Sequence, residues 1–253
     1  MRRALLLGAA AAGATRPTVT RRAALGACAA PLVPTAARAA YDPATYDRYA
    51  KSYDELDGGR AAAALGIAAA RRDMAARCAG RVLEVGAGTG LQAPFYASNS
   101  DIKGVTFVDA SRGMLDALRS KLEAVPLPFP AAAVEADAAR LPVASGAYDT
   151  AVDTFGLCVY DDPVAVLREL GRAVGPNGRV LLLENARPRN ALLGAYVDAT
   201  AGAVARYGGK GCRYDQDVEG LARAAGLRVL RSEAFGGGFF RSLELVPSPA
   251  PGQ

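Results

Sequence analysis

Short apolar runs alternate with amphipathic segments over most of the chain beyond residue 80. The runs have the length and composition of buried strands, and they cover residues 81–86, 103–108, 132–135, 149–154 and 179–184. Residues 111–122 and 163–174, which lie between them, repeat their apolar positions with the helical period. Strands that alternate with helices predict an α/β fold whose parallel sheet is covered by helices on both faces.

The carboxyl-terminal part breaks this alternation. Residues 227–235 and 239–246 have the pattern of two strands, and only the three glycines at 236–238 separate them. That connection is too short for a crossover helix, so the two strands must pair antiparallel. We therefore expect a doubly wound, mostly parallel, Rossmann-like sheet of seven strands that ends in an antiparallel hairpin. A nicotinamide-binding domain would instead continue with parallel units.

Residues 41–80 carry a helical pattern and form the expected amino-terminal cap of a single domain that spans 41–246. Tyr46, Tyr49 and Tyr53 follow the spacing of one helix face, and Gly80 is expected to end the helical stretch. Residues 247–253 contain three prolines and are expected to form a disordered tail.

The first 40 residues have the composition of a targeting leader. They contain 15 alanines, six arginines and no acidic residue, as organellar transit peptides do. Residues 20–25 read T-R-R-A-A-L and A-R-A follows at 37–39, which together resemble a twin-arginine thylakoid signal. This pattern favours a plastid, with a mitochondrial presequence as the alternative. The uncharged residues 23–37 contain two prolines and are too short to span a bilayer, so no transmembrane helix is predicted.

The charge of the chain changes once this leader is set aside. The whole chain carries 30 Lys plus Arg against 25 Asp plus Glu, but without the six leader arginines the balance is 24 against 25. A nearly neutral domain is unsuited to binding nucleic acid through bulk charge, so we expect no nucleic-acid partner. We expect a small-molecule acceptor instead. A peripheral contact with a membrane and the oligomeric state are left open.

The histidine and cysteine content limits the kinds of catalytic and metal-binding site that the chain can form. Histidine is absent, which excludes an imidazole base, an imidazole metal ligand and a Ser-His-Asp triad. The four cysteines, Cys28, Cys78, Cys158 and Cys212, are far apart in the sequence and form no C-x-x-C pair. We therefore predict neither a disulfide framework nor a metal site.

A glycine-rich turn follows the first apolar run. Residues 82–90 read V-L-E-V-G-A-G-T-G, a buried strand that leads directly into the turn. Glycines allow the backbone to pass close to a ligand. The dinucleotide fingerprint G-x-G-x-x-G needs a glycine at position 91, where this chain has Leu91. The spacing therefore disfavours nicotinamide-dependent oxidoreduction.

Acidic residues follow the next two strands. Asp109 comes directly after the second apolar run, where a carboxylate can accept hydrogen bonds from ribose hydroxyls. Asp137 follows the third run. Because the carboxyl ends of parallel strands meet at one edge of a sheet, we expect the glycine turn and both aspartates to form a single cofactor site there.

This succession resembles the class I S-adenosylmethionine-dependent methyltransferases, from E-x-G-x-G-x-G at 84–90 through Asp109 and S-R-G-M at 111–114 to E-A-D-A at 135–138. The resemblance implies S-adenosylmethionine as the cofactor and assigns its adenine amino group to Asp137. The residues that it implies for cofactor binding are Glu84, Gly86, Ala87, Gly88, Gly90, Asp109, Ala110, Met114, Asp137, Ala138 and Thr154.

Residues 148–163 resemble two particular groups of methyltransferases. They contain F-G-L-C and then D-D-P, which is similar to quinone-ring C-methyltransferases and to a mitochondrial methyltransferase-like family of fungi. G-R-V-L-L-L-E at 178–184 and G-C-R at 211–213 extend the similarity to the second group, although that family has a histidine where this chain has Asn185. We therefore expect methyl transfer to a small, apolar acceptor such as a quinol, lipid or thiol. The alternative is an organellar assembly factor of the same fold with weak or no catalysis.

Position along the strands suggests the base and the acceptor side. Without histidine the candidate bases are carboxylates, tyrosines and bound water, and among them we select Asp153 or Glu184. The residues expected to line the acceptor pocket are Tyr46, Tyr53, Phe155, Cys158, Tyr160, Cys212 and Tyr214. Ordinary packing is the alternative explanation for Cys158 and for the amino-terminal tyrosines Tyr41, Tyr46, Tyr49 and Tyr53. In related methyltransferases a tyrosine-rich amino-terminal helix closes over the cofactor.

Overall fold

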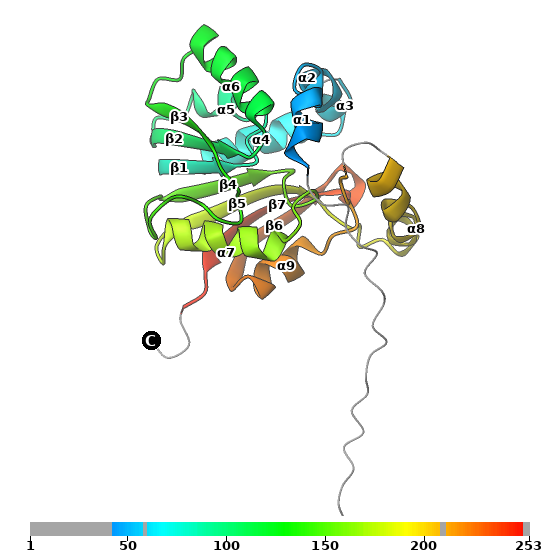
Figure 1. Cartoon of the computed structure of the whole chain (residues 1–253). Helices are drawn as coiled ribbons and strands as arrows, with labels where there is room; N and C mark the ends of the chain where they lie inside the picture. Colours follow the sequence, from blue (N-terminus) through cyan, green and yellow to red (C-terminus); the bar gives the residue numbers. More distant parts are fainter. Residues whose placement is uncertain (1–41, 58–59, 208–210, 250–253) are drawn as a thin grey trace, which may run out of the picture. The chain divides into compact units, whose positions relative to one another are not determined.

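Within the described residues, seven strands form one sheet at the centre of the fold (Figure 1). The computed structural model describes residues 42–57, 60–207 and 211–249. The strands are β1 (Gly80–Val85), β2 (Ile102–Asp109), β3 (Ala131–Glu135), β4 (Thr150–Thr154), β5 (Arg179–Asn185), β6 (Leu227–Phe235) and β7 (Phe240–Pro247). The expected leader at 1–40 lies outside the described residues, as do the last four residues of the expected tail.

The strand order is β3-β2-β1-β4-β5-β7-β6. Strands β1 to β5 pair in parallel, whereas β7 is antiparallel to both β5 and β6. The predicted α/β, Rossmann-like sheet with a closing hairpin is therefore confirmed. The second strand of the hairpin, rather than the first, joins the parallel sheet, so β7 lies between β5 and β6.

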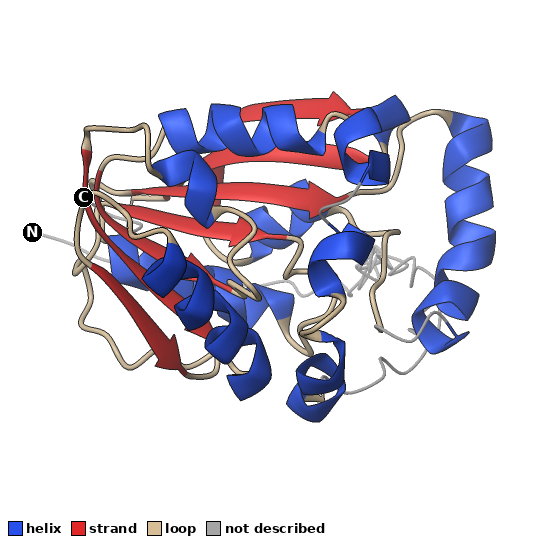
Figure 2. Ribbon diagram, turned by 90° about the horizontal axis from the view of Figure 1, so that it is seen from above, coloured by secondary structure: helices blue, strands red, loops and turns tan. Residues whose placement is uncertain are grey.

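Helices cover both faces of this sheet, as Figure 2 shows. The helices are α1 (Pro43–Tyr49), α2 (Tyr53–Asp57), α3 (Arg60–Ala64), α4 (Ile67–Ala76), α5 (Ala93–Tyr96), α6 (Arg112–Ala124), α7 (Pro163–Val174), α8 (Ala191–Tyr207) and α9 (Val218–Ala224), with a short 3₁₀ helix at Gly236–Gly238. The bounds of α7 match the predicted helix at 163–174. Helix α8 lies in a segment for which the sequence pattern gave no prediction.

The sheet buries a separate apolar core on each face. Leu83 and Leu182 belong to the core that α7 and α9 complete, whereas their neighbours Val82 and Leu181 belong to the core that α4, α5 and α6 complete. All four side chains are fully buried, and burying one such side chain contributes about 1.5 to 3 kcal/mol. Strands covered on both faces have continuous apolar sequences, which explains the runs in the pattern.

Side-chain caps determine where the helices at the carboxyl edge of the sheet begin. The side chains of Ser111, Asp162 and Asp217 each accept a hydrogen bond from the backbone N–H three residues ahead, at the starts of α6, α7 and α9. Two of these starts, those of α6 and α7, follow strands that carry predicted site residues. The caps therefore help to hold the loops of the site in place.

The amino-terminal segment differs from the helical stretch predicted over 41–80. Four short helices occupy its described part, and α1 ends at Tyr49 whereas Tyr53 begins α2. Tyr46 and Tyr53 therefore lie on different helices, and the prediction of one shared face was wrong. Gly80 opens β1 instead of ending a helix. Alanine-rich sequence favours helix everywhere in this segment, so contacts with the rest of the fold decide where it turns.

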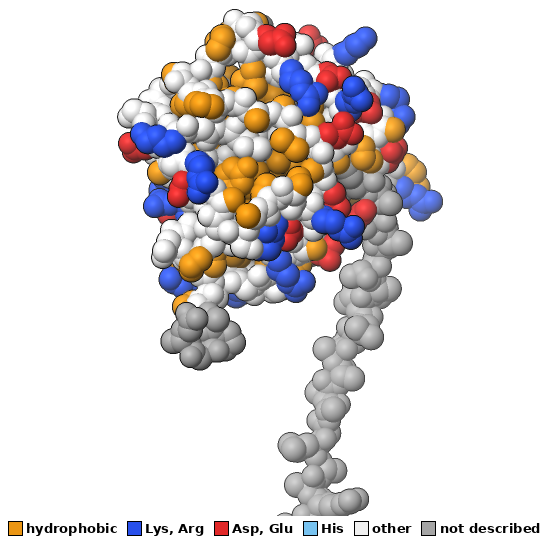
Figure 3. All heavy atoms as spheres, turned by 60° about the vertical axis from the view of Figure 1, so that its left-hand side comes forward, with side chains coloured by type: hydrophobic (Ala, Val, Ile, Leu, Met, Phe, Trp, Pro, Cys, Tyr) orange, Lys and Arg blue, Asp and Glu red, His pale blue; other side chains and the backbone are white. Residues whose placement is uncertain are grey.

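Charged side chains of both signs are interspersed on the face shown in Figure 3, around apolar side chains in its middle. Among the described residues, five of the eight large apolar side chains that are exposed belong to α8. Figures 1 and 2 both show this helix at the right, apart from the helices that cover the sheet. In the described part of the chain, no helix has the length and apolarity needed to cross a bilayer.

Candidate functional site

The glycine-rich turn leaves β1 at the carboxyl edge of the sheet. Gly86 and Gly88 have φ angles of 56° and 54°, in the left-handed region that favours glycine. A Cβ atom on Gly86 would also lie 2.5 Å from the hydroxyl oxygen of Tyr160. Both backbone conformation and space therefore require glycine at this point.

Asp109 ends β2 beside this turn and joins it to the start of α6. Its Oδ2 atom accepts a 2.8 Å hydrogen bond from the N–H of Gly88, and its Oδ1 atom accepts one of 2.8 Å from the N–H of Ser111. Asp109 is 7% exposed. Burial raises the pKa of its carboxyl, against the lowering effect of the Ser111 and Gly88 N–H groups. One carboxyl thus positions two segments of the candidate cofactor site.

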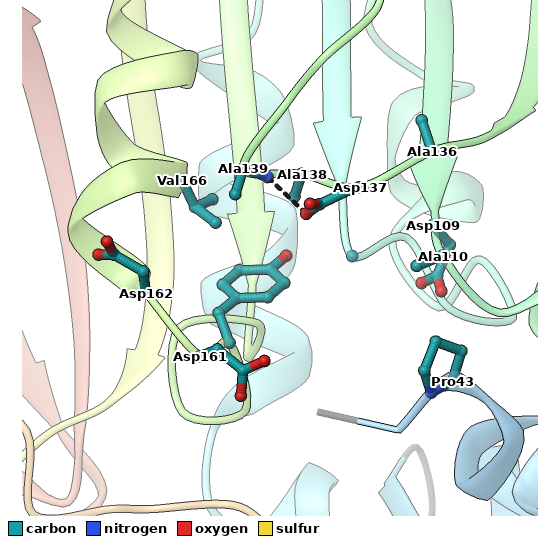
Figure 4. Close-up of a pocket in the computed structure, with 12 residues that line it drawn as sticks. Pro43, Asp109, Ala110, Ala136, Asp137, Ala138, Ala139, Asp161, Asp162 and Val166 are labelled. Atoms are coloured by element: carbon teal, nitrogen blue, oxygen red, sulfur yellow. Dashed lines mark hydrogen bonds between the residues drawn. The ribbon is translucent and has the colours of Figure 1, made fainter. Parts of the chain in front are cut away.

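A cavity of about 350 Å³ lies at this edge of the sheet (Figure 4). Its lining residues are Pro43, Gly86, Asp109, Ala110, Ala136, Asp137, Ala138, Ala139, Tyr160, Asp161, Asp162 and Val166. Figure 4 shows Asp109, Asp137 and Asp161 around the cavity, each from a different strand end or loop. The Oδ1 atom of Asp137 accepts a 2.8 Å hydrogen bond from the N–H of Ala139, drawn as the dashed line.

Six of the residues predicted from the sequence meet in this cavity. They are Gly86, Asp109, Ala110, Asp137, Ala138 and Tyr160. Other predicted cofactor residues do not line it but belong to β1, the glycine turn, the first turn of α6 and the end of β4, namely Glu84, Ala87, Gly88, Gly90, Met114 and Thr154. The sequence pattern had indicated no role for Pro43, Ala136, Ala139 or Val166. Asp161 and Asp162 stood in a family motif but received no role either.

Three acidic side chains are buried at the ends of β1, β4 and β5. Glu84, Asp153 and Glu184 are each at most 1% exposed. The Oε2 atom of Glu84 accepts a 2.8 Å hydrogen bond from the Tyr96 hydroxyl, and Oε1 of Glu184 accepts one of 3.2 Å from the N–H of Gly156. The structure thus gathers both proposed bases, Asp153 and Glu184, with a third carboxyl that the sequence had associated only with the cofactor.

Burial raises the pKa of all three carboxyls. The pKa of Glu84 rises to about 7, although the Tyr96 hydroxyl and the Arg71 guanidinium lower it. Burial also raises the pKa of Asp153 and of Glu184 well above the ordinary range; Glu84 adds to the rise at Asp153, and Asp153 adds to it at Glu184. A carboxylate whose pKa is shifted toward neutrality is a stronger base than an exposed one.

Phe155, directly after β4, is the only non-glycine residue with a positive φ among those the structure describes, at 62°. Such a conformation costs about 1 to 3 kcal/mol and persists only when the surroundings hold it. The guanidinium of Arg71 lies 5.5 Å from the Phe155 ring centroid and donates a 3.2 Å hydrogen bond to Thr154 Oγ1, while the ring packs edge-on against Phe240 at 5.9 Å. Nothing in the alanine-rich sequence around Arg71 indicates that its side chain contacts Thr154 and Phe155.

Cys158, Cys212 and Asn185 lie together beside the end of β5. Asn185 Nδ2 donates a 3.4 Å hydrogen bond to Cys212 Sγ, and the N–H of Arg213 donates one of 3.0 Å to the carbonyl of Cys158. The Cys212 thiol and burial raise the pKa of the Cys158 thiol. A thiol that resists ionisation is a poor nucleophile, so this environment favours packing over reactivity for Cys158.

The predicted acceptor-side residues do not form one pocket with the cavity. Among Tyr46, Tyr53, Phe155, Cys158, Tyr160, Cys212 and Tyr214, only Tyr160 lines it. The Tyr214 hydroxyl lies 2.9 Å from Thr200 Oγ1 and so links the segment after residue 211 to α8. These side chains are spread over three parts of the chain: the amino-terminal helices, the loop after β4 and the segment that follows α8.

Helix α1 is anchored to the start of α6 through one carboxylate. The Oδ1 atom of Asp47 accepts hydrogen bonds from the Ser111 hydroxyl at 2.6 Å and from the N–H of Gly113 at 2.8 Å. These two bonds lower the pKa of Asp47. Because Ser111 also follows the site residue Asp109, α1 is held beside the cavity, to which it contributes Pro43.

Helix α2 is anchored to the glycine-rich turn itself. Asp54 accepts a 2.5 Å hydrogen bond from the Thr89 hydroxyl and forms an ion pair of 2.5 Å with Lys121. Lys121 in turn donates to the Thr89 carbonyl at 2.8 Å. The ring of Tyr53 lies 3.9 Å from the place of a Cβ atom on Gly88. These contacts, which the sequence did not indicate, hold α2 against the glycine-rich turn.

The Asp54 anchor leads to a first prediction. Asp54→Ala should weaken binding of the expected cofactor about tenfold, because one hydrogen bond and one ion pair no longer hold α2 over the turn. Titration calorimetry with S-adenosylmethionine measures the change. Glu55→Ala, the same truncation at an exposed neighbour in α2, should leave the affinity unchanged. Equal affinities in the two variants would show that α2 plays no part in cofactor binding.

Comparison with known proteins identifies relatives of this chain. Residues 83–182 match the family described as "Methyltransferase domain", a stretch that runs from β1 into β5. The mitochondrial methyltransferase Oms1 of Saccharomyces cerevisiae is 32% identical over 163 residues, which cover 58% of this chain and 34% of that protein. The ubiquinone/menaquinone biosynthesis C-methyltransferase UbiE of Syntrophotalea carbinolica is 34% identical over 170 residues, which cover 65% of this chain and 70% of that protein.

Solved structures share the fold. A SAM-dependent methyltransferase from Aquifex aeolicus matches with a TM-score of 0.59 and 17% identity, over 81% of this chain and 99% of that chain. At this identity the likeness concerns the fold alone. The match to Oms1, in contrast, spans only about a third of the yeast protein's length.

Proposed function

Because the chain belongs to the class I S-adenosylmethionine-dependent methyltransferases, we propose that it transfers a methyl group to a small, apolar acceptor of the quinol, lipid or thiol class. The observation that carries the proposal is the site at the carboxyl edge of the sheet. There Asp109 and the glycine turn border a cavity of about 350 Å³, with Asp153 and Glu184 buried nearby.

The residues at the cavity suit the cofactor. The turn borders the cavity at Gly86, where the left-handed φ of 56° and the close approach of Tyr160 require glycine. Asp109 offers carboxylate oxygens for ribose hydroxyls and Asp137 offers one for the adenine amino group, and both line the cavity. When bound, S-adenosylmethionine supplies an electrophilic methyl group on a sulfonium whose leaving group needs no acid.

The chain's own residues then position the acceptor and receive its proton. Asp153 and Glu184 are the proposed bases, because they are buried together near the turn and burial raises the pKa of each carboxyl, which makes its ionised form a stronger proton acceptor. Helix α1, anchored by Asp47, contributes Pro43 to the cavity, and α2, anchored by Asp54, lies against the glycine turn. Holding the acceptor in line in a dry site supplies much of the rate enhancement in such a displacement.

The environment beyond the cavity supports an apolar acceptor. Phe155, Phe235 and Phe240 form an aromatic group, with ring centroids 5.9 Å and 5.3 Å apart, next to the end of β4. Leu157 and Cys158 follow Phe155 and are at most 2% exposed. The UbiE relative carries ubiquinone and menaquinone in its name, which supports a quinol among the three acceptor classes.

The base assignment gives a second prediction. Asp153→Asn should lower kcat about 100-fold while cofactor affinity stays within a few-fold of wild type, because the amide cannot accept the proton. Since a raised pKa keeps the carboxyl protonated in acid, wild-type kcat should rise with pH, and this rise should disappear in the variant. Asp101→Asn, at an exposed position, is the control. If Asp153→Asn keeps full activity and Glu184→Gln loses it, Glu184 is the base.

Direct detection of the product tests the function. The full chain is incubated with methyl-labelled S-adenosylmethionine and an organellar lipid extract, and the labelled species is identified by mass spectrometry. A labelled quinol, lipid or thiol that depends on Asp109 supports the proposal. Failure of the wild-type chain to bind S-adenosylmethionine by calorimetry, or a labelled species that is polar or macromolecular, refutes it.

Asn185 favours a second candidate, an assembly factor that retains the fold with weak or no turnover. The related family has histidine at this position, whereas Asn185 here is engaged with Cys212 Sγ at 3.4 Å. Cofactor binding without labelled product from any extract would support this candidate. Turnover at a rate typical of enzymes would exclude it.

An organelle is the proposed location. The arginine-rich, acid-free composition of residues 1–40 supports it, and the yeast relative is mitochondrial by name, so we favour the mitochondrion over the plastid suggested by the twin-arginine pattern. A fusion of residues 1–41 to a fluorescent protein tests this choice. Cytosolic fluorescence would contradict both locations.

A further inference from the structure

Helix α8 has an inverted distribution of apolar side chains. A surface helix ordinarily buries its apolar stripe and exposes its polar one. In α8 only Gly194, Val197 and Ala201 are buried, whereas Leu192 is 83% exposed, Tyr196 is 59% exposed and Tyr207 is 78% exposed. The small residues face the protein and the large apolar ones face away from it.

The exposed apolar residues of α8 form one continuous face. Leu192, Tyr196 and Tyr207 recur with the helical period, and Leu193 and Val204, 36% and 41% exposed, extend the stripe along one side. We call these five residues the outer face of α8. A contiguous apolar surface on a soluble domain marks an interaction site.

An arginine lies beside the outer face, at the ring of Tyr207. Residues 186–207 contain three arginines, Arg187, Arg189 and Arg206, and one acidic residue, Asp198. Arg187 pairs with Asp198 at 2.7 Å and Arg189 pairs with Glu219 at 3.1 Å, whereas Arg206 lies over the ring of Tyr207, 5.6 Å from its centroid. Arg206 thus borders the apolar stripe near the end of the helix, where it would attract anionic groups.

This combination matches helices that lie in the surface of a bilayer. Such helices bury an apolar face among the acyl chains and place basic residues at the level of the phosphates, and tyrosine is enriched at that depth. A second copy of the chain is a weaker candidate. A helix of 17 residues is about 25 Å long, so the outer face offers a contact area of roughly 250 to 500 Å². A stable protein–protein interface buries about 800 Å² on each partner, which is more than this face provides.

We propose that the outer face of α8 docks the protein on an anionic lipid bilayer. The chain connects this face to the site, since α8 follows the end of β5 and the Tyr214 segment returns from it through the contact with Thr200. An apolar acceptor, which this inference takes from the proposed function, would then reach the site from the bilayer without crossing water.

Vesicle flotation tests the proposal with the full chain. Vesicles of equal parts phosphatidylcholine and phosphatidylglycerol should carry the wild type. The triple variant Leu192→Gln, Tyr196→Gln and Tyr207→Gln should bind these vesicles at least about tenfold more weakly, because three apolar anchors are lost. The substitutions leave the charge unchanged, and the basic residues 1–40 are the same in all variants. Val125→Gln with Leu230→Gln, at exposed apolar positions outside α8, is the matched control and should bind as wild type.

Several results would overturn the proposal. The first is a wild-type chain that does not float with the vesicles, and the second is a triple variant that floats as well as the wild type. The third is a wild type that sediments as a dimer and a triple variant that sediments as a monomer, with no change in flotation. That result would assign the face to a second copy. Calorimetry with S-adenosylmethionine on the same samples separates this inference from the proposed function. Normal cofactor binding without flotation refutes the docking alone, whereas absent cofactor binding in the wild type refutes the function.

Discussion

Asp109→Ala should lower the affinity for S-adenosylmethionine about 100-fold or more. Hydrogen bonds to a charged group contribute about 1.5 to 3 kcal/mol each, and the variant removes the carboxylate proposed to accept from the ribose. It also leaves the N–H groups of Gly88 and Ser111 without their acceptor, so the glycine turn and the start of α6 lose their common anchor. Titration calorimetry gives the affinity, and methyl transfer should fall in parallel.

A second substitution and a control make this result interpretable. Asp109→Asn keeps the shape and one acceptor oxygen, so we expect an intermediate affinity and a fold closer to wild type. Asp116→Ala removes an exposed carboxylate of α6 whose hydrogen bond is to Arg119, and it should bind the cofactor normally. Thermal unfolding of each variant shows whether the fold persists. Wild-type affinity in a folded Asp109→Ala protein would remove Asp109 from the cofactor site.

The free energy of unfolding should fall as the pH rises from about 4.5 to about 7, and Glu84→Gln should remove part of this fall. Burial raises the pKa of Glu84 from 4.5 to about 7 in the folded protein. Within this window the folded state holds a proton that the unfolded chain has released, so stability is greatest at the acid end and is lost as the pH rises through the folded-state value. For this fully buried carboxyl the two values correspond to about 3 kcal/mol.

Denaturant titrations of the cofactor-free protein at several pH values measure this slope. Asp153 and Glu184 contribute in the same direction, since burial raises the pKa of each, so the wild type retains some slope even without Glu84. The informative quantity is the difference between wild type and Glu84→Gln across the window. Glu123→Gln, the same change at an exposed position, should follow the wild type. An equal slope in wild type and Glu84→Gln would mean that the Glu84 carboxyl ionises as an exposed one does.

The cofactor side was more accessible to sequence reasoning than the acceptor side. The glycine turn, Asp109 and Asp137 each follow a strand within a few residues, so placing the strands also places these residues at one edge, and Gly86, Asp109 and Asp137 do line one cavity. Arg71, Asp47 and Asp54 escaped prediction because they act through partners 21 or more residues away in sequence, such as Thr89 for Asp54 and Thr154 for Arg71. No local pattern distinguishes such a residue from a solvated charge.

The sequence by itself determined the class of fold, because parallel strands buried on both faces need continuous apolar runs and a three-glycine connection permits only a hairpin. It also determined that no imidazole takes part in the chemistry. Only the tertiary structure decided that β7 enters between β5 and β6, that Glu84, Asp153 and Glu184 are buried together, and that α8 turns its apolar side chains outward. Burial and strand order depend on contacts between distant segments, and a pattern along one chain records only the local preference of each residue.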